Sequence, residues 1–312
     1  MLKKRKQTEE QRIRDLAEDL LKGVAHRYWL NEPWKAEEVL PRDKWTAAEH
    51  AVSLELLERL GQVERSEGRW LLTEAGRTRA VELLRAHRLM ETYLARKEGL
   101  PAEELHAKAD EAEHSLTHER INELADTLNR PRFDPHGDPI PERDKSYHDV
   151  SQIPLFQAET GMSARIVHIE DEPMEDFEKL NQLGFALELP IQILGQTGKE
   201  TVVELAGEEL KLNTALASHI EVVPLLEDES YPDDLRRLTA LKSGEEGIVE
   251  FISAACMGPE RRRLQDFGLV PGSRISCDFS SPFGSPIAYS IRGSKIGLRK
   301  QQARNVFIRR TK

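Results

Sequence analysis

The sequence has few cysteines, few aromatic residues and no long apolar run. Of its 312 residues only Cys256 and Cys277 are cysteines, and aromatic residues make up 6%. Two cysteines are typical of a protein from a reducing compartment, and their separation matches no zinc-ligand spacing. No stretch approaches the ~18 uncharged apolar residues of a membrane-spanning helix. The basic start, residues 1–7, is followed by no apolar segment of the secretory type. We therefore expect a cytoplasmic protein without a membrane span.

Sequence signatures of common enzyme classes are also missing. We find no glycine-rich phosphate loop, no Gly-x-Ser-x-Gly and no His-Glu-x-x-His. Each of these motifs places a nucleophile, a phosphate cradle or a zinc ion in a defined local geometry. The segment Ser280–Gly284 is rich in glycine, serine and proline but is typical of a turn. We predict that the protein is not an enzyme.

Charge is distributed unevenly along the chain, whose formal net charge is −10. Residues 1–80 carry 16 basic and 15 acidic side chains, whereas residues 81–150 carry 10 and 16. An acidic centre lowers the electrostatic cost of gathering divalent cations, and it disfavours a general coat for nucleic acid. Any contact with DNA would therefore have to come from the first 80 residues.

The first 80 residues show the element order of a winged helix-turn-helix. Apolar residues recur with helical periodicity in the first segment, and proline residues end the first two segments. A Ser-Glu-Gly turn then separates two short apolar runs that read as a hairpin. Three helices and two strands are predicted, over residues 8–28, 34–40, 47–60, 63–65 and 70–73. This order is that of a DNA-reading module.

The predicted recognition helix has few side chains suited to DNA. Thr46 is a suitable N-cap, with Glu49 at the third helical position of a capping box. The candidates for DNA contact are Arg42, Lys44, Thr46 and His50, since bases and phosphates are met mostly by basic and hydroxyl side chains. The carboxylate of Glu49 would repel phosphate. Specific DNA binding and a retained fold used for packing or protein contact both remain open.

Six metal-type side chains lie on two predicted helices between residues 87 and 114. His87 and Glu91 are four residues apart and therefore stack on one helix face. On the next helix four further side chains fall within an arc of ~100°. These are His106, Asp110, Glu113 and His114. Two such faces turned towards each other would bring imidazoles and carboxylates to shared divalent ions.

A family resemblance appears over the same region. Leu72-Thr-Glu-Ala-Gly-Arg, His87-Arg-Leu-x-Glu, His106-x3-Asp-x2-Glu-His and Asp134-Pro-His-Gly-Asp-Pro-Ile-Pro occur in this order. The run resembles the diphtheria-toxin-repressor family of iron- and manganese-dependent transcriptional regulators. The resemblance implies a winged-helix domain, a helical domain that binds metal and dimerises, and C-terminal SH3-like domains. It is also the reason why we predict a homodimer.

The resemblance assigns the metal-type residues to two sites. His87, Glu91 and His106 match the ancillary site, and Asp110, Glu113 and His114 match most of the other. Asp19, in a Glu-Asp-Leu-Leu segment, is the candidate ligand from the first helix. Ligands without thiolate favour Mn²⁺ or Fe²⁺ over softer ions. Manganese-sensing members carry a glutamate three residues after this aspartate, whereas this chain has Lys22, whose ammonium would oppose cation binding.

Two apolar stripes accompany the metal-type residues. Ile121, Leu124 and Leu128 continue an apolar stripe down the helix that begins near His106. A second stripe runs along the preceding helix and includes Leu83, Leu84, Leu89, Tyr93 and Leu94. Part of this surface must be intramolecular core. The segment Asp134–Pro141 is predicted to be a structural turn that closes the helical domain.

Residues 151–312 contain an internal repeat. Lys179-Leu-Asn-Gln-Leu-Gly parallels Arg263-Leu-Gln-Asp-Phe-Gly, and a second pair of motifs begins at Gly207 and Gly293. Each copy predicts a strand, a short helix and three or four further strands. The copies resemble FeoA-like SH3 domains, which mostly bind protein segments; the first copy is the more degenerate.

We therefore predict an α+β multidomain protein with four parts. These are a winged helix (1–80), a helical metal-binding and dimerisation domain (81–149), and two small SH3-like β-barrels of the FeoA type (150–226 and 232–312). The predicted function is a metal-dependent, DNA-binding transcriptional regulator of metal-ion homeostasis, with Mn²⁺ or Fe²⁺ as the bound ion. The alternative is a cytosolic metal-sensing module of a metal-transport system that has lost operator binding. The sequence does not identify the metal, the operator or the partner of the SH3-like domains.

Overall fold

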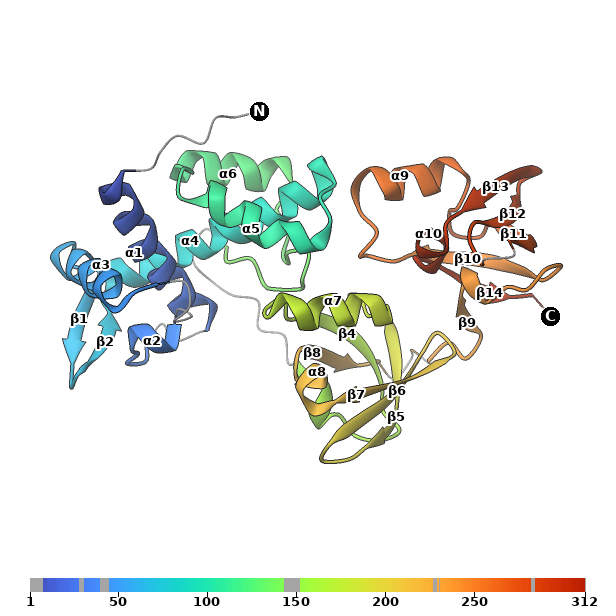
Figure 1. Ribbon diagram of the computed structural model, residues 1–312, viewed down its shortest axis with the longest axis horizontal. Coiled ribbons are helices and arrows are strands. Elements are labelled where there is room, and N and C mark those ends of the chain that lie inside the picture. The colour runs from blue at the N-terminus through green and yellow to red at the C-terminus, as the bar shows by residue number, and fades with distance from the viewer. Residues whose placement is uncertain are drawn as a thin grey trace. The chain divides into compact units, whose positions relative to one another are not determined.

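The computed structural model describes residues 8–27, 31–39, 45–142, 152–226, 229, 231–281 and 284–311. Their contacts divide the chain into two compact units (Figure 1). The N-terminal unit holds the described residues of Met1–Tyr93, His106–Asp134 and Pro139–His148. The C-terminal unit holds those of Leu94–Leu105, Pro135–Asp138 and Asp149–Lys312. Within the described ranges, no helix is long and apolar enough to cross a bilayer.

The N-terminal unit begins with the helices and hairpin that the sequence predicts. Its first elements are α1 (Glu9–His26), α2 (Ala36–Val39), α3 (Ala47–Arg59), β1 (Val63–Ser66) and β2 (Arg69–Leu72). The β1–β2 hairpin projects from the helices in Figure 1. Its strands pair antiparallel, and two backbone hydrogen bonds of 2.8 and 2.9 Å join Trp70 to the buried Trp34. This arrangement confirms the predicted winged helix-turn-helix order.

Local chemistry explains where these helices begin. The hydroxyl of Thr8 accepts a hydrogen bond from the Gln11 amide and starts α1, whose apolar side, including Leu20 and Leu21, is buried. At α3 the Thr46 hydroxyl accepts from the Glu49 amide, and the Glu49 carboxylate accepts from the Thr46 amide. The predicted capping box is therefore confirmed.

Three further helices follow: α4 (Glu74–Tyr93), α5 (Ala102–Glu113) and α6 (His118–Thr127). The N-terminal unit contains α4, α6 and the part of α5 from His106 onward. Ile121, Leu124 and Leu128 pack against Leu89 in one buried cluster, so this part of the predicted apolar surface is intramolecular core. The prediction that one long helix runs from His106 to Leu128 was wrong. The chain leaves the helix after Glu113, and the Thr117 hydroxyl caps a new helix by accepting from the Arg120 amide.

The segment that follows α6 is a turn held by buried polar groups. The guanidinium of Arg88, which is 1% exposed, donates to the carbonyl oxygen of Pro139 at 2.6 Å. Arg85 donates in the same way to Pro141, and Phe133 forms an antiparallel bridge with Pro139. Pro139 and Pro141 are thus held against α4, as expected of a turn that closes the helical part of this unit.

The first β repeat of the C-terminal unit is a six-stranded antiparallel sheet of order β3-β8-β4-β5-β6-β7. Its helix α7 lies beside the strands in Figure 1. The elements of this repeat are β3 (Ile153–Pro154), η2 (Leu155–Gln157), β4 (Ser163–Ile169), α7 (Met174–Leu183), β5 (Pro190–Gln196), β6 (Glu200–Leu205), β7 (Glu208–Asn213), α8 (Thr214–Ser218) and β8 (Ile220–Pro224).

The second repeat has the same design, with strand order β9-β14-β10-β11-β12-β13. Corresponding strands carry irregular pairing at corresponding places, between Ile166 and His168 in one copy and between Val249 and Phe251 in the other. The elements are β9 (Leu235–Arg237), η3 (Leu238–Ala240), β10 (Glu246–Ile252), α9 (Gly258–Asp266), β11 (Arg274–Ser280), β12 (Ile287–Ile291), β13 (Ser294–Leu298), α10 (Lys300–Arg304) and β14 (Val306–Arg310).

The strand orders agree only in part with the predicted SH3-like β-barrels. Each repeat was expected to be an SH3-like β-barrel, and each is sheet-rich with short helices. Among the described residues, however, each strand order runs between two edge strands and does not close into a ring. Both cysteines are free and buried in the second repeat, where they serve as small core side chains.

The two repeats share part of their apolar core. Leu235 and Phe307, from β9 and β14 of the second repeat, belong to the buried cluster of the first repeat. Phe307 stacks on Phe251 with ring centroids 4.8 Å apart. The guanidinium of Arg237 lies 4.9 Å from the Phe307 ring and donates to the carbonyl oxygens of Gly184 and Arg304. The repeats are therefore joined by packing as well as by the chain.

Candidate metal centre

Three helices of the N-terminal unit bring the predicted metal ligands together. His87 and Glu91 lie on α4, and His106, Asp110 and Glu113 lie on α5. His114 follows the last residue of α5, and Asp19 comes from α1. The seven side chains form two neighbouring groups. Asp110 and Glu113, which are one helical turn apart on α5, lie at the boundary between the groups.

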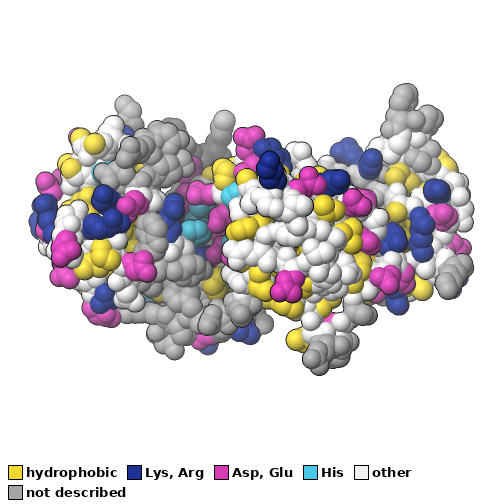
Figure 2. Space-filling view, turned by 90° about the horizontal axis from the view of Figure 1, so that it is seen from below, with side chains coloured by type: hydrophobic (Ala, Val, Ile, Leu, Met, Phe, Trp, Pro, Cys, Tyr) yellow, Lys and Arg dark blue, Asp and Glu magenta, His cyan; other side chains and the backbone are white. Residues whose placement is uncertain are grey.

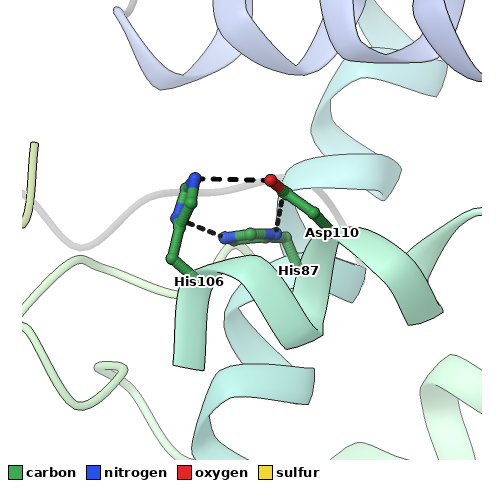
Figure 3. Close-up of side chains that lie close together, drawn as sticks. All are labelled: His87, His106 and Asp110. Carbon is green, nitrogen blue, oxygen red and sulfur yellow. Dashed lines mark hydrogen bonds and ion pairs between the residues drawn. The ribbon is translucent and has the colours of Figure 1, made fainter. Parts of the chain in front are cut away.

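The first group lies around the two ring nitrogens of His87 (Figure 3). His87 Nε2 is 3.0 Å from Glu91 Oε1 and 3.2 Å from His106 Nδ1. His106 Nδ1 is in turn 3.4 Å from Glu91 Oε1. On the other side of the ring, His87 Nδ1 is 3.4 Å from Asp110 Oδ1, and the second oxygen of Asp110 faces His106 Nε2 at 3.6 Å. His87 and Glu91 are buried, and His106 is partly exposed.

The second group joins α1 to the end of α5. His114 Nε2 lies 3.3 Å from Asp19 Oδ1 and 3.9 Å from Glu113 Oε1. The opposite ring nitrogen, Nδ1, lies 2.9 Å from Glu18 Oε2. Asp19, Glu113 and His114 offer ligand atoms within 4.8 Å of one another. This group ties the first helix of the winged-helix elements to the helical part of the same unit.

A lysine ammonium lies between the two groups. Lys22 Nζ, from α1, is 2.5 Å from Asp110 Oδ1 and 2.8 Å from Glu113 Oε1. It is also 3.4 Å from His87 Nδ1. Burial lowers the pKa of Lys22, but the carboxylates of Glu113 and Asp110 outweigh burial and hold it above its ordinary value. The side chain therefore carries its positive charge into the centre.

The carboxylates also hold protons on the histidine rings. Burial and the Lys22 ammonium lower the pKa of His87, but Glu91 and Glu113 raise it to about 10. Burial lowers the pKa of His114, but hydrogen bonds to Asp19 and Glu18 raise it to about 10. A metal ion binds the neutral imidazole, so an ion that enters either group must replace a proton.

The first group has the spacing of a metal site. Donor atoms that bind one ion at about 2.1 Å lie roughly 3 to 3.4 Å apart. The three mutual distances among His87 Nε2, Glu91 Oε1 and His106 Nδ1 are 3.0, 3.2 and 3.4 Å. The donors are nitrogen and oxygen without thiolate, which suits Mn²⁺ or Fe²⁺. The residues present therefore fit a divalent transition metal.

Sequence reasoning missed two carboxylates of this centre. Glu18 and Asp15 lie with His114 in a further group whose ligand atoms are within 4.8 Å of one another. Glu18 also forms a 2.6 Å ion pair with Arg79 of α4. Burial raises the pKa of Glu18, but hydrogen bonds from His114 and Arg79 bring it below its ordinary value. The available signal was spacing, because Asp15, Glu18 and Asp19 share one face of α1.

The residues predicted to contact DNA are engaged within the fold or lie outside the described residues. Arg42 and Lys44 lie outside them. The Thr46 hydroxyl donates to Glu49 at 2.7 Å as part of the cap of α3. His50 is 6% exposed. The exposed side of α3 instead includes Ala51, Val52 and Glu55.

The hairpin arginines are also engaged internally. Arg65 stacks over the Trp70 ring at 4.9 Å, and Arg69 forms a 2.6 Å ion pair with Glu38. On the face drawn in Figure 2, basic and acidic side chains of the described residues are interspersed. The coloured part of this face therefore presents no continuous basic surface of the kind that tracks a phosphate backbone.

Comparison with known sequences decides the family. The family described as "Iron dependent repressor, metal binding and dimerisation domain" matches residues 73–142. The match spans α4, α5 and α6 and so contains two of the three helices that carry candidate metal ligands, while α1 lies outside it. The helical segment of residues 73–142 therefore belongs to the metal-binding and dimerisation domains of iron-dependent repressors. The FeoA domain matches twice, at residues 153–224 and 236–310, which confirms the internal repeat and its FeoA-like character.

Curated relatives of this chain fall into two kinds. The iron-dependent repressor IdeR of Mycobacterium tuberculosis is 44% identical over 70 residues, which are 22% of this chain and 30% of that protein. The diphtheria toxin repressor of Corynebacterium glutamicum is 29% identical over 178 residues, 53% of this chain and 77% of that protein. A probable metal transport system membrane protein of Chlamydia trachomatis is 44% identical over 88 residues, 28% of this chain. This chain thus spans only 20% of the chlamydial protein and 30% of the Mycobacterium tuberculosis IdeR.

Solved structures agree with the family assignment. A manganese-dependent transcriptional repressor in complex with manganese superposes with a TM-score of 0.61 at 26% identity. The superposition covers 67% of this chain and all of the known one. An IdeR from T. acidophilum shares the fold, with a TM-score of 0.54 at 23% identity. The expected α+β architecture of helical and FeoA-type parts is thereby confirmed.

Proposed function

We propose that this protein is a metal-dependent, DNA-binding transcriptional regulator of metal-ion homeostasis. It acts in the cytoplasm as a homodimer and takes Mn²⁺ or Fe²⁺. Its four parts are the winged helix (1–80), the helical metal-binding and dimerisation domain (81–149) and the two FeoA-type domains (150–226 and 232–312). The family match and the regulatory character of the relatives support this assignment and disfavour an enzyme.

One observation carries the proposal: the metal-type side chains link α1 to α4 and α5. Asp19 and Glu18 lie on α1, which packs against α3, whereas His114 follows α5. A cation held by His114 and Asp19 would fix α1 and, through it, the winged helix. Ligand binding acts as a switch when it favours one arrangement over another. The candidate ligands are His87, Glu91, His106, Asp110, Glu113, His114 and Asp19.

A DNA-binding titration tests this function. The probe is the protein's own promoter region, at about 50 and 200 mM salt, with Mn²⁺ or Fe²⁺ and with chelator. We expect binding that requires metal and weakens steeply with salt, as for any contact with phosphates. The His106→Ala, His114→Ala double variant removes an imidazole from each group and should bind in neither condition. Equal binding with and without metal, or no binding at all, would overturn the regulator assignment.

A second candidate is a metal-sensing module of a metal-transport system without an operator. The exposed side of α3, with Ala51, Val52 and Glu55, favours it, because this side offers few donors to base edges. The similarity to a probable metal transport system membrane protein also favours it. Metal binding by calorimetry together with the absence of metal-dependent DNA binding would select this candidate.

A further inference from the structure

Lys22 lies at the centre of the metal site and contacts three of the candidate ligands. Its Nζ is 2.5 Å from Asp110 Oδ1, 2.8 Å from Glu113 Oε1 and 3.4 Å from His87 Nδ1. The lysine side chain is 13% exposed and that of Glu113 is fully buried. The ammonium is thus held inside the unit.

The contacted atoms are the ones that a second cation would need. Asp110 and Glu113 are the carboxylates at the boundary between the two groups. An ion placed there would bind the carboxylate oxygens that now accept hydrogen bonds from Lys22 Nζ. A divalent ion bound to Asp110 Oδ1 would lie next to the ammonium. Two cations this close in a buried site repel each other strongly. The ammonium and a bridging ion therefore exclude each other.

The other side of His87 faces a different set of partners. His87 Nε2 points to Glu91 and His106, at 3.0 and 3.2 Å. The ring of His87 separates these donors from Lys22, which approaches Nδ1. A metal ion held by His87 Nε2, Glu91 and His106 is therefore compatible with Lys22 in its present place.

We propose that Lys22 is a tethered cation that takes the place of one divalent ion between Asp110 and Glu113. The inference rests on the proposed metal-sensing function and deepens it. In the metal-free protein the single positive charge of the ammonium lies between two carboxylates and offsets their mutual repulsion. It also ties α1 to α5 without a metal ion, through Asp110 and Glu113. Sensing then depends on the sites that Lys22 leaves open, and the number of ions bound per chain is one lower than the donors allow.

The test compares the full chain with a Lys22→Met variant, which keeps the length of the side chain and removes its charge. The measurements are Mn²⁺ bound per chain at saturation, by equilibrium dialysis with elemental analysis, and the thermal midpoint in chelator. We expect the variant to bind one additional Mn²⁺ per chain. We also expect its metal-free midpoint to fall by roughly 5 °C, because the buried Glu113 and the partly exposed Asp110 lose their counter-ion.

Lys108→Met is the matched control. Lys108 lies on α5 and pairs with Glu111 on the surface, so the substitution removes the same charge away from the centre. It should leave both measurements at the wild-type values. A Lys22→Met variant that binds the same number of ions with the same affinity as wild type overturns the proposal, even if its midpoint falls, and leaves the proposed function standing. If none of the three proteins binds Mn²⁺ or Fe²⁺, the metal-sensing function fails and this inference fails with it.

Discussion

At the scale of single residues, His168 of β4 lies between carboxylates in the C-terminal unit. Its Nε2 is 3.5 Å from Asp138 Oδ2 and its Nδ1 is 3.6 Å from Glu221 Oε2. Burial lowers the pKa of His168, but the hydrogen bond to Asp138 and the charges of Glu221 and Glu170 raise it to about 9. The imidazole of His168 therefore binds its proton more tightly in the folded protein than in the unfolded chain.

This geometry predicts how stability depends on pH. A histidine whose pKa is about 9 when folded and about 6.5 when unfolded stabilises the fold fully below pH 6.5. The contribution, up to about 3 kcal/mol, is lost as the pH rises through 9. We expect the free energy of unfolding of the His168→Gln variant, measured in urea, to decline less than that of wild type between pH 6.5 and 9.5.

Other groups near His168 also titrate, so the difference between variant and wild type is the quantity to measure. Burial raises the pKa of Glu170 to about 7, and it raises that of Glu221. His118→Gln, at an exposed histidine of the other unit, should follow the wild-type curve. A His168→Gln curve parallel to that of wild type across this range would contradict the prediction.

The candidate site could be predicted residue by residue only in part. Spacing alone placed His87 with Glu91 and His106 with Asp110, because a helix has a fixed period. The position of Lys22 was also visible, and its ammonium was expected to oppose cation binding. The sequence did not show that the ammonium turns inward, because this depends on how α1 packs against α4 and α5.

At the scale of elements, the start of α4 depends on a close approach between backbones. The Gly76 amide donates to the Thr73 hydroxyl, which in turn donates to the carbonyl oxygen of Gly61. A Cβ at Gly76 would lie 1.8 Å from the carbonyl oxygen of Gln62. The glycine of the Leu72–Arg77 motif is therefore required because only a hydrogen atom fits between α4 and the loop after α3.

We expect Gly76→Ala to destabilise the N-terminal unit by about 2–3 kcal/mol, the cost of a rigid overpacked contact. Gly198→Ala is the control, because a Cβ there would have no atom within 4 Å. Urea unfolding followed by tryptophan fluorescence reports on this unit, since all four tryptophans lie between residues 29 and 70. Equal midpoints for the two variants would show that the loop can move aside at little cost.

Element boundaries were predictable where a cap was present in the sequence, and least so where the apolar pattern ran on. The Thr46–Glu49 capping box located the start of α3 to the residue. The break between α5 and α6 was missed because apolar residues recur throughout Leu105–Leu128 and were assigned to one continuous helix. Thr117 was the available signal, since threonine favours N-cap positions.

At the scale of the whole molecule, each compact unit has its own architecture, and the C-terminal unit contains the duplicated FeoA-type fold. The repeat was visible in sequence because paired motifs recur at a nearly constant separation. The core shared between the copies was not visible. Phe307 occupies the position of an ordinary strand residue, and only the tertiary packing assigns it to the first repeat.

We expect the two FeoA-type repeats to unfold together. Phe307→Ala should lower the free energy of unfolding of the C-terminal unit by about 3–5 kcal/mol, as for other buried aromatic residues. Hydrogen exchange should then quicken in β4 and β8 of the first repeat as well as in β14. Leu264→Ala, within the core of the second repeat alone, is the matched variant. If Phe307→Ala quickens exchange only in the second repeat, the shared core contributes little to the stability of the first repeat.

The contribution of β14 to the first repeat has a consequence for the order of events during synthesis. Residues 153–224 leave the ribosome well before Phe307, and domains generally fold as they emerge. The first FeoA-type sheet can pair its strands at that stage, yet an apolar surface stays open until β9 and β14 arrive. The nascent chain thus passes through an interval of about 80 residues in which this surface is available to chaperones, or to the wrong partner.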